Sequence, residues 1–396
     1  MRRTPSIASR AAFHRLSALV SLFLFAGCPL PAWAGKAGGG GTPPVDSGSI
    51  YYTIPDNVQG LMHLWRMKPD GTAKTRLLTV PIEGREDVFE PSKARHGQQR
   101  WFLRLQTMDG TYPDPGGSMP SPWLRRELFA ISEMGDQVQL TDDPTFQPND
   151  TYGTAVGHAH PRWALSDEGT TDGRVTLVGR RWNSEGTAIA EIGLFAVEFD
   201  PESLPANSGG NLGLIPARLP VNVVVSYFEY YGTIYGDAAS VHGYDWSPSG
   251  RQVVVAQPGE DLKIADLDTL QSVTLVPEAP PEAASPRNPR WSPVLASGQT
   301  QVLFALNTVV GLSIQRINAD GSGRVTVVPP YNPNSSKRSL SDAACWSPAG
   351  TCFLYGNFTT YQGVAEFYRV TADGLSPQCL TKNVTESCSF RGWTAP

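Results

Sequence analysis

Histidines are the side chains of this sequence best suited to acid–base or metal chemistry, and there are only six of them in 396 residues. His158, His160 and His242 stand shortly before tryptophans of a recurring motif, three residues before in the case of His160 and four in the case of His242. Successive side chains of a strand point to opposite faces, so a residue three positions before the tryptophan and one four positions before it lie on opposite faces. The two imidazoles are therefore expected to point apart. We therefore expect no metal site and no cofactor.

Other catalytic signals are weak. The sequence contains no Gly-x-Ser-x-Gly motif, which presents the nucleophilic serine of α/β-hydrolases on a sharp turn. The formal net charge is −5 and lysine and arginine form no basic patch, so a nucleic-acid partner is not expected. No residue is predicted to be catalytic, and the chain is predicted not to be an enzyme.

The first 34 residues have the organisation of a secretory signal peptide. A stretch with several arginines precedes an apolar run over residues 16–27, and Ala32-Trp33-Ala34 fits a signal-peptidase site. The run is too short for a transmembrane helix. Leu24-Phe25-Ala26-Gly27-Cys28 offers an alternative, because it resembles a bacterial lipobox and would leave Cys28 lipidated. The protein is thus predicted to be periplasmic or secreted, or else a lipoprotein whose only contact with the membrane is its lipid anchor.

Four further cysteines lie near the C-terminus, and an even number in an exported protein predicts disulfides with three possible pairings. We predict Cys345–Cys352, because these two residues flank a short turn and could face each other on adjacent strands. We also predict Cys379–Cys388. The spacing of the four cysteines is not that of a zinc site.

One motif recurs along the rest of the chain: a tryptophan, a tight turn and an apolar strand. Its clearest copy is Trp246-Ser247-Pro248-Ser249-Gly250, followed by a β-branched run over residues 252–256. Ser, Pro and Gly stand where a type I turn favours them. The copies carry Trp163, Trp246, Trp291, Trp346 and Trp393, and an earlier copy has Lys93 in place of the tryptophan. The shortest interval, about 45 residues, is typical of propeller blades with four strands each.

The repeats predict six blades and a closed ring. Their second to fourth strands are expected at residues 49–54, 62–67 and 75–79; 101–105, 127–131 and 137–140; 174–180, 194–199 and 217–221; 252–256, 262–265 and 272–276; 301–306, 313–317 and 324–328; and 352–357, 366–370 and 378–381. The first blade lacks a first strand, whereas the chain continues past the sixth blade to Trp393. We predict that this surplus strand joins the N-terminal blade and closes the ring.

The full unit resembles the TolB-type propeller repeat, which also builds the propeller of prolyl oligopeptidases. The likeness lies in the Trp-Ser-Pro-x-Gly turns, in later Asp-Gly turns and in the strand ends Leu78-Thr79, Leu140-Thr141 and Leu380-Thr381. It covers residues 49–396 and implies an all-β, six-bladed propeller of four-stranded antiparallel blades, without a hydrolase domain. Residues 1–34 are then a signal peptide and residues 35–48 a Gly-rich flexible linker. The usual Asp of the Trp-Ser-Pro turn is replaced by Ser249 and Ala349, so no role of that Asp is transferred.

The resemblance implies a non-enzymatic module that binds proteins of the periplasm or cell envelope. The motif tryptophans are interpreted as structural wedges. An alternative hypothesis is a polysaccharide lyase or another hydrolase, because oligogalacturonate lyases have a similar propeller and use channel histidines and a metal.

Binding is expected on the face with the long loops, at residues 83–89, 106–126 and 227–241. In a four-stranded meander these loops emerge on one side, and exposed aromatic side chains commonly anchor interfaces. The candidate binding residues are Trp123, Tyr227, Phe228, Tyr230, Tyr231, Tyr235, His160 and His242.

Overall fold

A computed structural model gives the structure of the chain. It describes residues 46–82, 90–92, 95, 99–112, 123–140, 162–165, 172–182, 189–198, 215–216, 243–256, 261–269, 271–277, 284–308, 311–330, 339–359, 364–381 and 388–396. The chain divides into Met1–Gly41 and Thr42–Pro396, and all described residues belong to the second unit. The predicted signal peptide, Cys28 and most of the Gly-rich linker lie outside the described residues.

Six four-stranded sheets make up the described part of the chain, and we number them as blades in chain order. Blade 1 contains β24 (Ser389–Thr394), β1 (Ser49–Asp56), β2 (Leu61–Met67) and β3 (Thr75–Pro81). Blade 2 contains β4 (Glu90–Pro91), β5 (Trp101–Tyr112), β6 (Trp123–Ser132) and β7 (Gln137–Gln139). Blade 3 contains β8 (Arg162–Leu165), β9 (Asp172–Trp182), β10 (Ile189–Glu198) and β11 (Ile215–Pro216).

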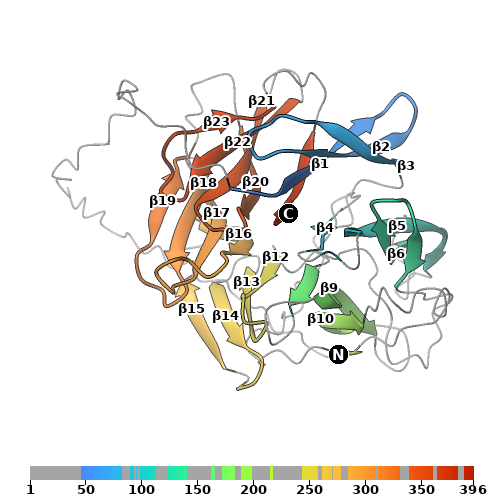
Figure 1. Cartoon of the computed structure of the whole chain (residues 1–396). Helices are drawn as coiled ribbons and strands as arrows, with labels where there is room; N and C mark the ends of the chain where they lie inside the picture. The colour runs from blue at the N-terminus through green and yellow to red at the C-terminus, as the bar shows by residue number, and fades with distance from the viewer. Residues whose placement is uncertain are drawn as a thin grey trace, which may run out of the picture. The chain divides into compact units, whose positions relative to one another are not determined.

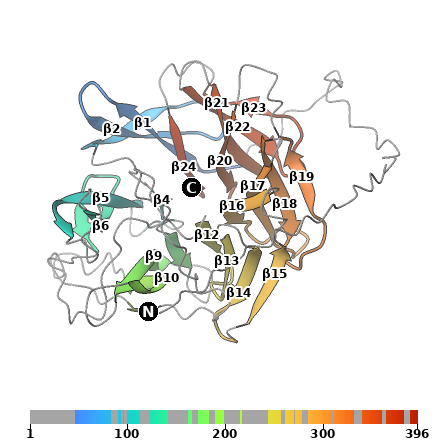
Figure 2. The ribbon, with the colours of Figure 1, turned by 180° about the vertical axis from the view of Figure 1, so that it is seen from behind.

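The later three blades follow the same pattern. Blade 4 contains β12 (Gly243–Trp246), β13 (Gln252–Ala256), β14 (Leu262–Asp266) and β15 (Ser272–Val276). Blade 5 contains β16 (Ala284–Trp291), β17 (Gln301–Thr308), β18 (Gly311–Asn318) and β19 (Val325–Val328). Blade 6 contains β20 (Ser339–Trp346), β21 (Cys352–Thr359), β22 (Val364–Thr371) and β23 (Gln378–Cys379). Figures 1 and 2 show the blades following one another around a common centre in chain order. The predicted all-β propeller of antiparallel blades is confirmed.

The C-terminal strand completes the N-terminal blade, as predicted. β24 pairs antiparallel with β1, with Ile50 opposite Trp393 and Thr53 opposite Ser389. Gly48 allows the close approach just before β1: its φ is +112°, and a Cβ there would lie 2.0 Å from the carbonyl oxygen of Thr394. The two ends of the described chain therefore share one sheet, which removes an open strand edge.

A serine hydroxyl fixes the start of the second strand in four blades. Ser247, Ser292 and Ser347 each accept a hydrogen bond from the backbone N–H that opens the next strand, at 2.8–3.1 Å. Ser92 accepts the same bond from Trp101 at 3.2 Å. Ser92 is therefore the motif serine of blade 2, and Pro91 occupies the tryptophan position. The prediction of Lys93 at that position is wrong by two residues, and Lys93 itself lies outside the described residues.

The motif tryptophans pack between neighbouring blades. Trp346 of blade 6 lies in one buried cluster with Leu303 and Val327 of blade 5. Trp291 of blade 5 packs in the same way with residues of blade 4, and Trp393 of blade 1 with residues of blade 6. Each indole thus fills the space between its own blade and the preceding blade, where a large flat side chain buries much apolar surface.

Two predicted segments differ from the structure. Residues 106–126 were expected to be a loop. In the structure β5 continues to Tyr112 and β6 begins at Trp123, and these two residues lie opposite each other in the sheet. Thr111, Tyr112 and Trp123 belong to residue types that favour strands, which explains why pairing continues this far. The outer strand of blade 3 is described at Ile215–Pro216, and residues 217–221, where it was expected, lie outside the described residues.

Candidate functional site

A cavity of about 370 Å³ opens among the first strands of the blades and the turns that follow them. Its lining includes Pro248, Pro293 and Pro348 from the three Trp-Ser-Pro turns, together with Arg391 and Ala395 from the end of the chain. These turns lie on the side of the propeller that carries all turns from first to second and from third to fourth strands. We call this side the turn face, and the opposite side the loop face.

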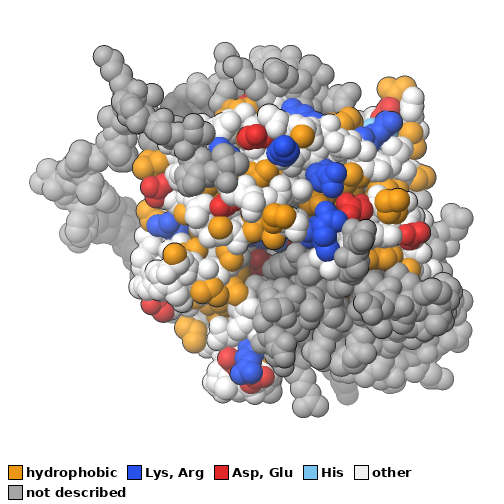
Figure 3. Space-filling model, in the orientation of Figure 1, with side chains coloured by type: hydrophobic (Ala, Val, Ile, Leu, Met, Phe, Trp, Pro, Cys, Tyr) orange, Lys and Arg blue, Asp and Glu red, His pale blue; other side chains and the backbone are white. Residues whose placement is uncertain are grey.

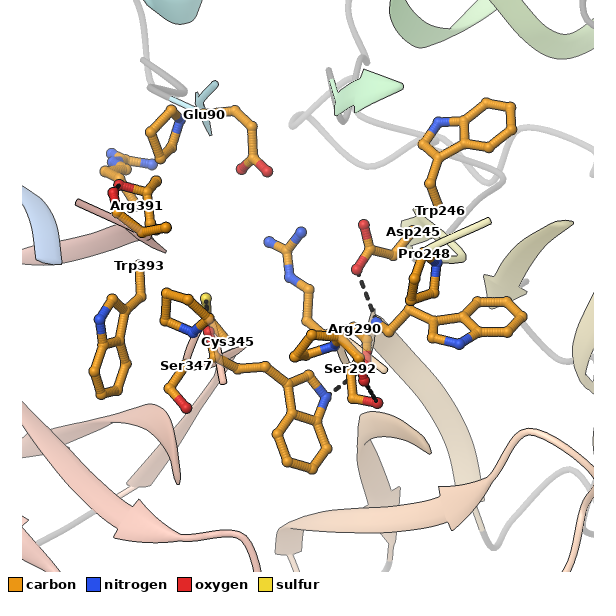
Figure 4. A pocket seen from close by; sticks show the side chains of 18 of the residues that line it. Glu90, Asp245, Trp246, Pro248, Arg290, Ser292, Cys345, Ser347, Arg391 and Trp393 are labelled. Atoms are coloured by element: carbon orange, nitrogen blue, oxygen red, sulfur yellow. Dashed lines mark hydrogen bonds between the residues drawn. The ribbon is translucent and has the colours of Figure 1, made fainter. Parts of the chain in front are cut away.

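The residue before the motif tryptophan lines the cavity in five of the six blades. Counting from the motif serine places Glu90, Asp245 and Arg290 at this position in blades 2, 4 and 5, and all three line the cavity. Blade 3 has no motif serine; there Arg162 directly precedes Trp163 and contacts the cavity-lining Glu90. Cys345 and Gly392 hold the same position in blades 6 and 1. We call the four charged residues the charged belt. Figure 4 shows the Arg290 guanidinium pointing into the space between the carboxylates of Glu90 and Asp245.

An ion pair joins the first two members of the charged belt. Arg162 Nη1 lies 3.2 Å from Glu90 Oε2, and the two side chains are only 5% and 13% exposed. Burial lowers the pKa of Arg162 and the nearby Arg290 lowers it further, while Glu90 and Asp245 raise it. A partly desolvated guanidinium is thus held among carboxylates of the same ring, as a buried charge requires.

Hydrogen bonds from the tryptophans hold this layer in place. Asp245 Oδ2 accepts the backbone N–H of Trp291 in the next blade at 2.8 Å. The indole N–H of Trp163 donates to the backbone carbonyl oxygen of Glu90 at 2.9 Å. The indole N–H of Trp346 donates to the backbone carbonyl oxygen of Arg290 at 3.1 Å. Because each bond crosses a blade boundary, the lining of the cavity is tied to the packing of the blades.

Blades 6 and 1 contribute uncharged positions. Burial raises the pKa of the Cys345 thiol to about 11, although Arg290 nearby lowers it. A thiol with so high a pKa remains protonated at neutral pH and is a poor nucleophile. Gly392 allows close packing, since a Cβ there would lie 2.4 Å from Pro91 Cγ in blade 2.

Most of the predicted binding residues cannot be compared with this cavity. His160, His242 and the aromatic residues Tyr227, Phe228, Tyr230, Tyr231 and Tyr235 lie outside the described residues. Trp123 is placed by its backbone as the first residue of β6, on the loop face. No group of three or more potential metal ligands occurs in the part of the chain that the structure describes.

None of the four C-terminal cysteines forms a disulfide in the structure. Cys345 faces Leu354 across blade 6, and Cys352 faces Thr371. The prediction that Cys345 and Cys352 oppose each other is therefore wrong. The turn between their strands is short, and it brings residue 347 rather than residue 345 to the position opposite Cys352.

The sequence prediction missed the charged belt. Its members share one signal, namely a charged residue directly before the motif tryptophan in three blades. In blade 2 the signal is hidden, because proline replaces tryptophan after Glu90. The hydrogen bond of Ser92 and the pairing of Pro91 with Phe102 establish the register there.

Comparisons by sequence found no matching family model and no matching curated protein. TolB from Acinetobacter baumannii has a similar structure, with a TM-score of 0.53, 10% identity, and coverage of 89% of this chain and 68% of that chain. A putative TolB from Agrobacterium tumefaciens has a TM-score of 0.45 and 13% identity, with coverage of 84% of this chain and 88% of that chain. An oligogalacturonate lyase from Vibrio parahaemolyticus has a TM-score of 0.40 and 13% identity, with coverage of 84% of this chain and 73% of that chain. Across the described residues, no helix has the length and apolarity to cross a membrane. The chain has the fold of a TolB-like β-propeller.

Proposed function

We propose that this chain is an exported, non-enzymatic propeller that binds another protein of the bacterial cell envelope at its turn face. The observation that carries the proposal is the cavity of about 370 Å³, whose rim repeats a proline from three successive blades. Rigid prolines around a concave, partly apolar site suit an extended protein segment, because little conformational freedom is lost on binding.

Exposed apolar side chains extend the same face beyond the cavity. Val294, which also lines the cavity, is 59% exposed, and Met134 and Leu375 are exposed in third-to-fourth turns of blades 2 and 6. Large apolar groups that gather on one face commonly mark a protein-binding surface. In the view of Figure 3 hydrophobic side chains alternate with charged ones, which is the mixed composition of a non-obligate interface.

The charged belt favours binding over chemistry. A general base must reach a substrate proton directly or through one water. Here the carboxylate of Glu90 lies in a buried ion pair with Arg162, and that of Asp245 holds the backbone of Trp291. Both carboxylates are thus engaged in joining the blades.

The loop face remains a second proposed surface. Tyr230 and Trp123 were selected there for their aromatic side chains, and Trp123 opens β6 on that face. A binding test therefore needs variants on both faces, so that the function and the location of the site are decided separately.

The test is recovery of envelope proteins on immobilised mature protein. We expect Val294→Asp combined with Leu375→Asp to abolish recovery of a specific partner. Val273→Asp, an equally exposed site on the outer strand of blade 4, should leave recovery unchanged. Loss only with Trp123→Ala and Tyr230→Ala would keep the binding function and move the site to the loop face.

An enzymatic assay tests the opposing hypothesis. The wild-type protein is incubated with polygalacturonate and Mn²⁺, and unsaturated products are measured by absorbance. Turnover that disappears in His160→Ala would overturn the non-enzymatic proposal. Recovery of no partner by either face, at any salt concentration, would overturn the binding proposal.

A further inference from the structure

Three arginines gather around one carboxylate on the turn face, where blades 1 and 2 meet. Arg66, near the end of β2, lies with Nη1 3.7 Å from Glu133 Oε2. Arg95, between β4 and β5, donates from Nη1 to Glu133 Oε1 at 3.0 Å. The backbone N–H of Arg100 donates to the same oxygen at 3.3 Å. We call Arg66, Arg95, Arg100 and Glu133 the arginine cluster.

The arginine cluster turns positive charge toward the solvent. The side chains of Arg66 and Arg95 are 35% and 36% exposed, whereas that of Glu133 is only 12% exposed. The carboxylate is thus the more deeply buried partner, and it holds the two guanidiniums from the protein side. A guanidinium carries five N–H donors in a rigid fork, so one that holds a carboxylate on one edge can receive a second carboxylate on another edge.

Like charges are brought together in this cluster. Burial lowers the pKa of Arg100, and the nearby Arg95 guanidinium lowers it further, whereas Glu133 raises it. The cluster itself contains three guanidiniums and one carboxylate, within a chain whose formal net charge is −5. An additional carboxylate would relieve the repulsion between the arginines. They come from two blades and lie far apart in the sequence, which is why the sequence alone predicted no basic patch.

The arginine cluster adjoins the cavity. Arg100 Nη2 donates to the carbonyl oxygen of Ala395 at 2.8 Å, and Ala395 lines the cavity. Arg100 Nη1 donates to the carbonyl oxygen of Ser92, the residue after the lining Pro91. Met134, which directly follows Glu133, is 75% exposed. A protein segment that leaves the cavity on this side therefore meets an apolar side chain and positive charge together.

We propose that the arginine cluster binds the acidic side chains of an extended partner segment in which aspartate or glutamate alternates with apolar residues. The inference rests on the proposed function, since it specifies the charge of the segment that the turn face binds. Arg66 and Arg95 supply charge-assisted hydrogen bonds to carboxylates of the segment, and Met134 contacts an apolar residue between them. Glu133 orients both guanidiniums in advance, which reduces the conformational freedom lost on binding.

The surroundings of the cluster favour a protein segment over a membrane. Anionic lipid surfaces are typically bound by clusters of about four to eight lysines and arginines. Here Asp70 and Asp136 are exposed in the third-to-fourth turns of blades 1 and 2, the turns that lie next to Arg66 and Glu133. A flat anionic surface would meet these carboxylates as well as the arginines, whereas a narrow segment engages the arginines alone.

Peptide binding to the purified mature protein tests the inference, with fluorescence anisotropy as the measurement. The probe is a short labelled peptide of alternating leucine and glutamate, and its counterpart has glutamine in place of glutamate. We expect the glutamate peptide to bind about tenfold more tightly, because a charge-assisted hydrogen bond is stronger than a neutral one. The preference should shrink as the salt concentration rises. This comparison uses the wild-type protein and does not depend on the folding of any variant.

Two double variants locate the site. Arg66→Gln/Arg95→Gln should weaken binding of the glutamate peptide about tenfold and leave binding of the glutamine peptide unchanged. Arg66→Lys/Arg95→Lys keeps the charge but loses the fork of donors, so its affinity should lie between those of the first variant and the wild type. Arg251→Gln is the matched control, because Arg251 is 59% exposed on the turn face of blade 4 and lies 3.9 Å from Asp268. The control should bind like the wild type, and thermal unfolding verifies that each variant is folded.

Equal affinities of the wild-type protein for the two peptides would overturn the inference, and so would unchanged binding by folded Arg66→Gln/Arg95→Gln. Vesicles of equimolar phosphatidylcholine and phosphatidylglycerol test the membrane alternative. Vesicle binding that this variant loses, without a preference for the glutamate peptide, would assign the cluster to lipid and would also overturn the inference.

Recovery of envelope proteins separates this inference from the proposed function. A partner that is lost with Val294→Asp/Leu375→Asp but retained by Arg66→Gln/Arg95→Gln would support binding at the turn face and contradict the acidic segment. A glutamate peptide that binds through the arginine cluster, although no envelope protein is recovered, would support the cluster as a site for acidic segments and contradict only the binding function in the envelope.

Discussion

Arg369 in β22 donates a hydrogen bond of 2.9 Å from Nη1 to the carbonyl oxygen of Pro69, which lies 300 residues earlier in the chain. The bond crosses from blade 6 to the third-to-fourth turn of blade 1. Arg316 makes the same contact one blade earlier, to the carbonyl oxygen of Ala372 at 2.7 Å. Arg66 repeats it one blade later through the carboxylate of Glu133, at 3.7 Å. A guanidinium thus joins each of three consecutive pairs of blades.

Arg369→Met should lower the free energy of unfolding by about 2–3 kcal/mol, because a buried carbonyl and the Gln378 side chain lose a charged donor. Urea unfolding followed by tryptophan fluorescence measures the change. Arg251→Met is the control, since Arg251 pairs with Asp268 at 3.9 Å with both side chains mostly exposed. An exposed pair of this kind contributes little. Equal effects of the two substitutions would contradict a special role for Arg369.

Stability should fall as the pH rises above about 10. Burial raises the pKa of Tyr52 to about 12, with the nearby Cys388 adding to the shift, whereas an unfolded tyrosine titrates near 10. Between these values the folded state binds more protons than the unfolded state, so each increase in pH favours unfolding. The contribution is fully present below about pH 10 and is lost as the pH approaches 12.

Urea unfolding at several pH values under reducing conditions tests this dependence. Tyr52→Phe removes one titrating group and should make the decline above about pH 10 shallower. Burial also raises the pKa of Tyr244, which remains in the variant, so part of the decline should persist. A variant that follows the wild-type curve at every pH would show that Tyr52 does not titrate in this way.

The repeated turns explain why so much of the fold could be predicted from the sequence. The Trp-Ser-Pro turn is local, so its residues specify it without reference to distant partners. In blade 4 all three predicted strands lie within one residue of the observed ones. Closure by residues 389–394 could be predicted as well, because a missing first strand and a surplus strand stand at opposite ends of the chain.

The candidate site was harder to predict because it is assembled by contacts between blades. Nothing local distinguishes Asp245 from a solvent-exposed aspartate, since its partner is the backbone of Trp291 in the next blade. The pairing of Glu90 with Arg162 similarly joins residues 72 positions apart. The cysteine prediction failed for a related reason: flanking a turn does not fix which residues oppose each other across it.

The N-terminal segment should be absent from the mature protein. The arginine-rich start, the apolar run and Ala32-Trp33-Ala34 predict cleavage before Gly35. Intact-mass measurement of protein recovered from the envelope fraction distinguishes the outcomes. A chain that starts at Gly35 supports plain cleavage, and a diacylated chain that starts at Cys28 supports the lipoprotein alternative. A chain that still begins at Met1 would contradict export.

Removal of residues 388–396 should leave the propeller open and unstable. β24 supplies the first strand of blade 1, and its loss exposes the unpaired edge of β1. Trp393, only 6% exposed, would leave the cluster that it shares with Ile50, Leu354 and Phe367, and truncation of such a side chain alone costs about 3–5 kcal/mol. The hydrogen bond of 2.8 Å from Arg100 Nη2 to the Ala395 carbonyl would be lost as well.

Thermal unfolding and light scattering compare the truncated chain with Trp393→Ala and with a control, Val58→Ala, whose side chain is 96% exposed. We expect the control to melt with the wild type, Trp393→Ala to melt lower, and the truncated chain to aggregate or to lose its cooperative transition. Because the strand contributes backbone pairing in addition to the indole, truncation should cost more than the substitution. A truncated chain that melts cooperatively at the wild-type temperature would show that β24 is not needed to close the ring.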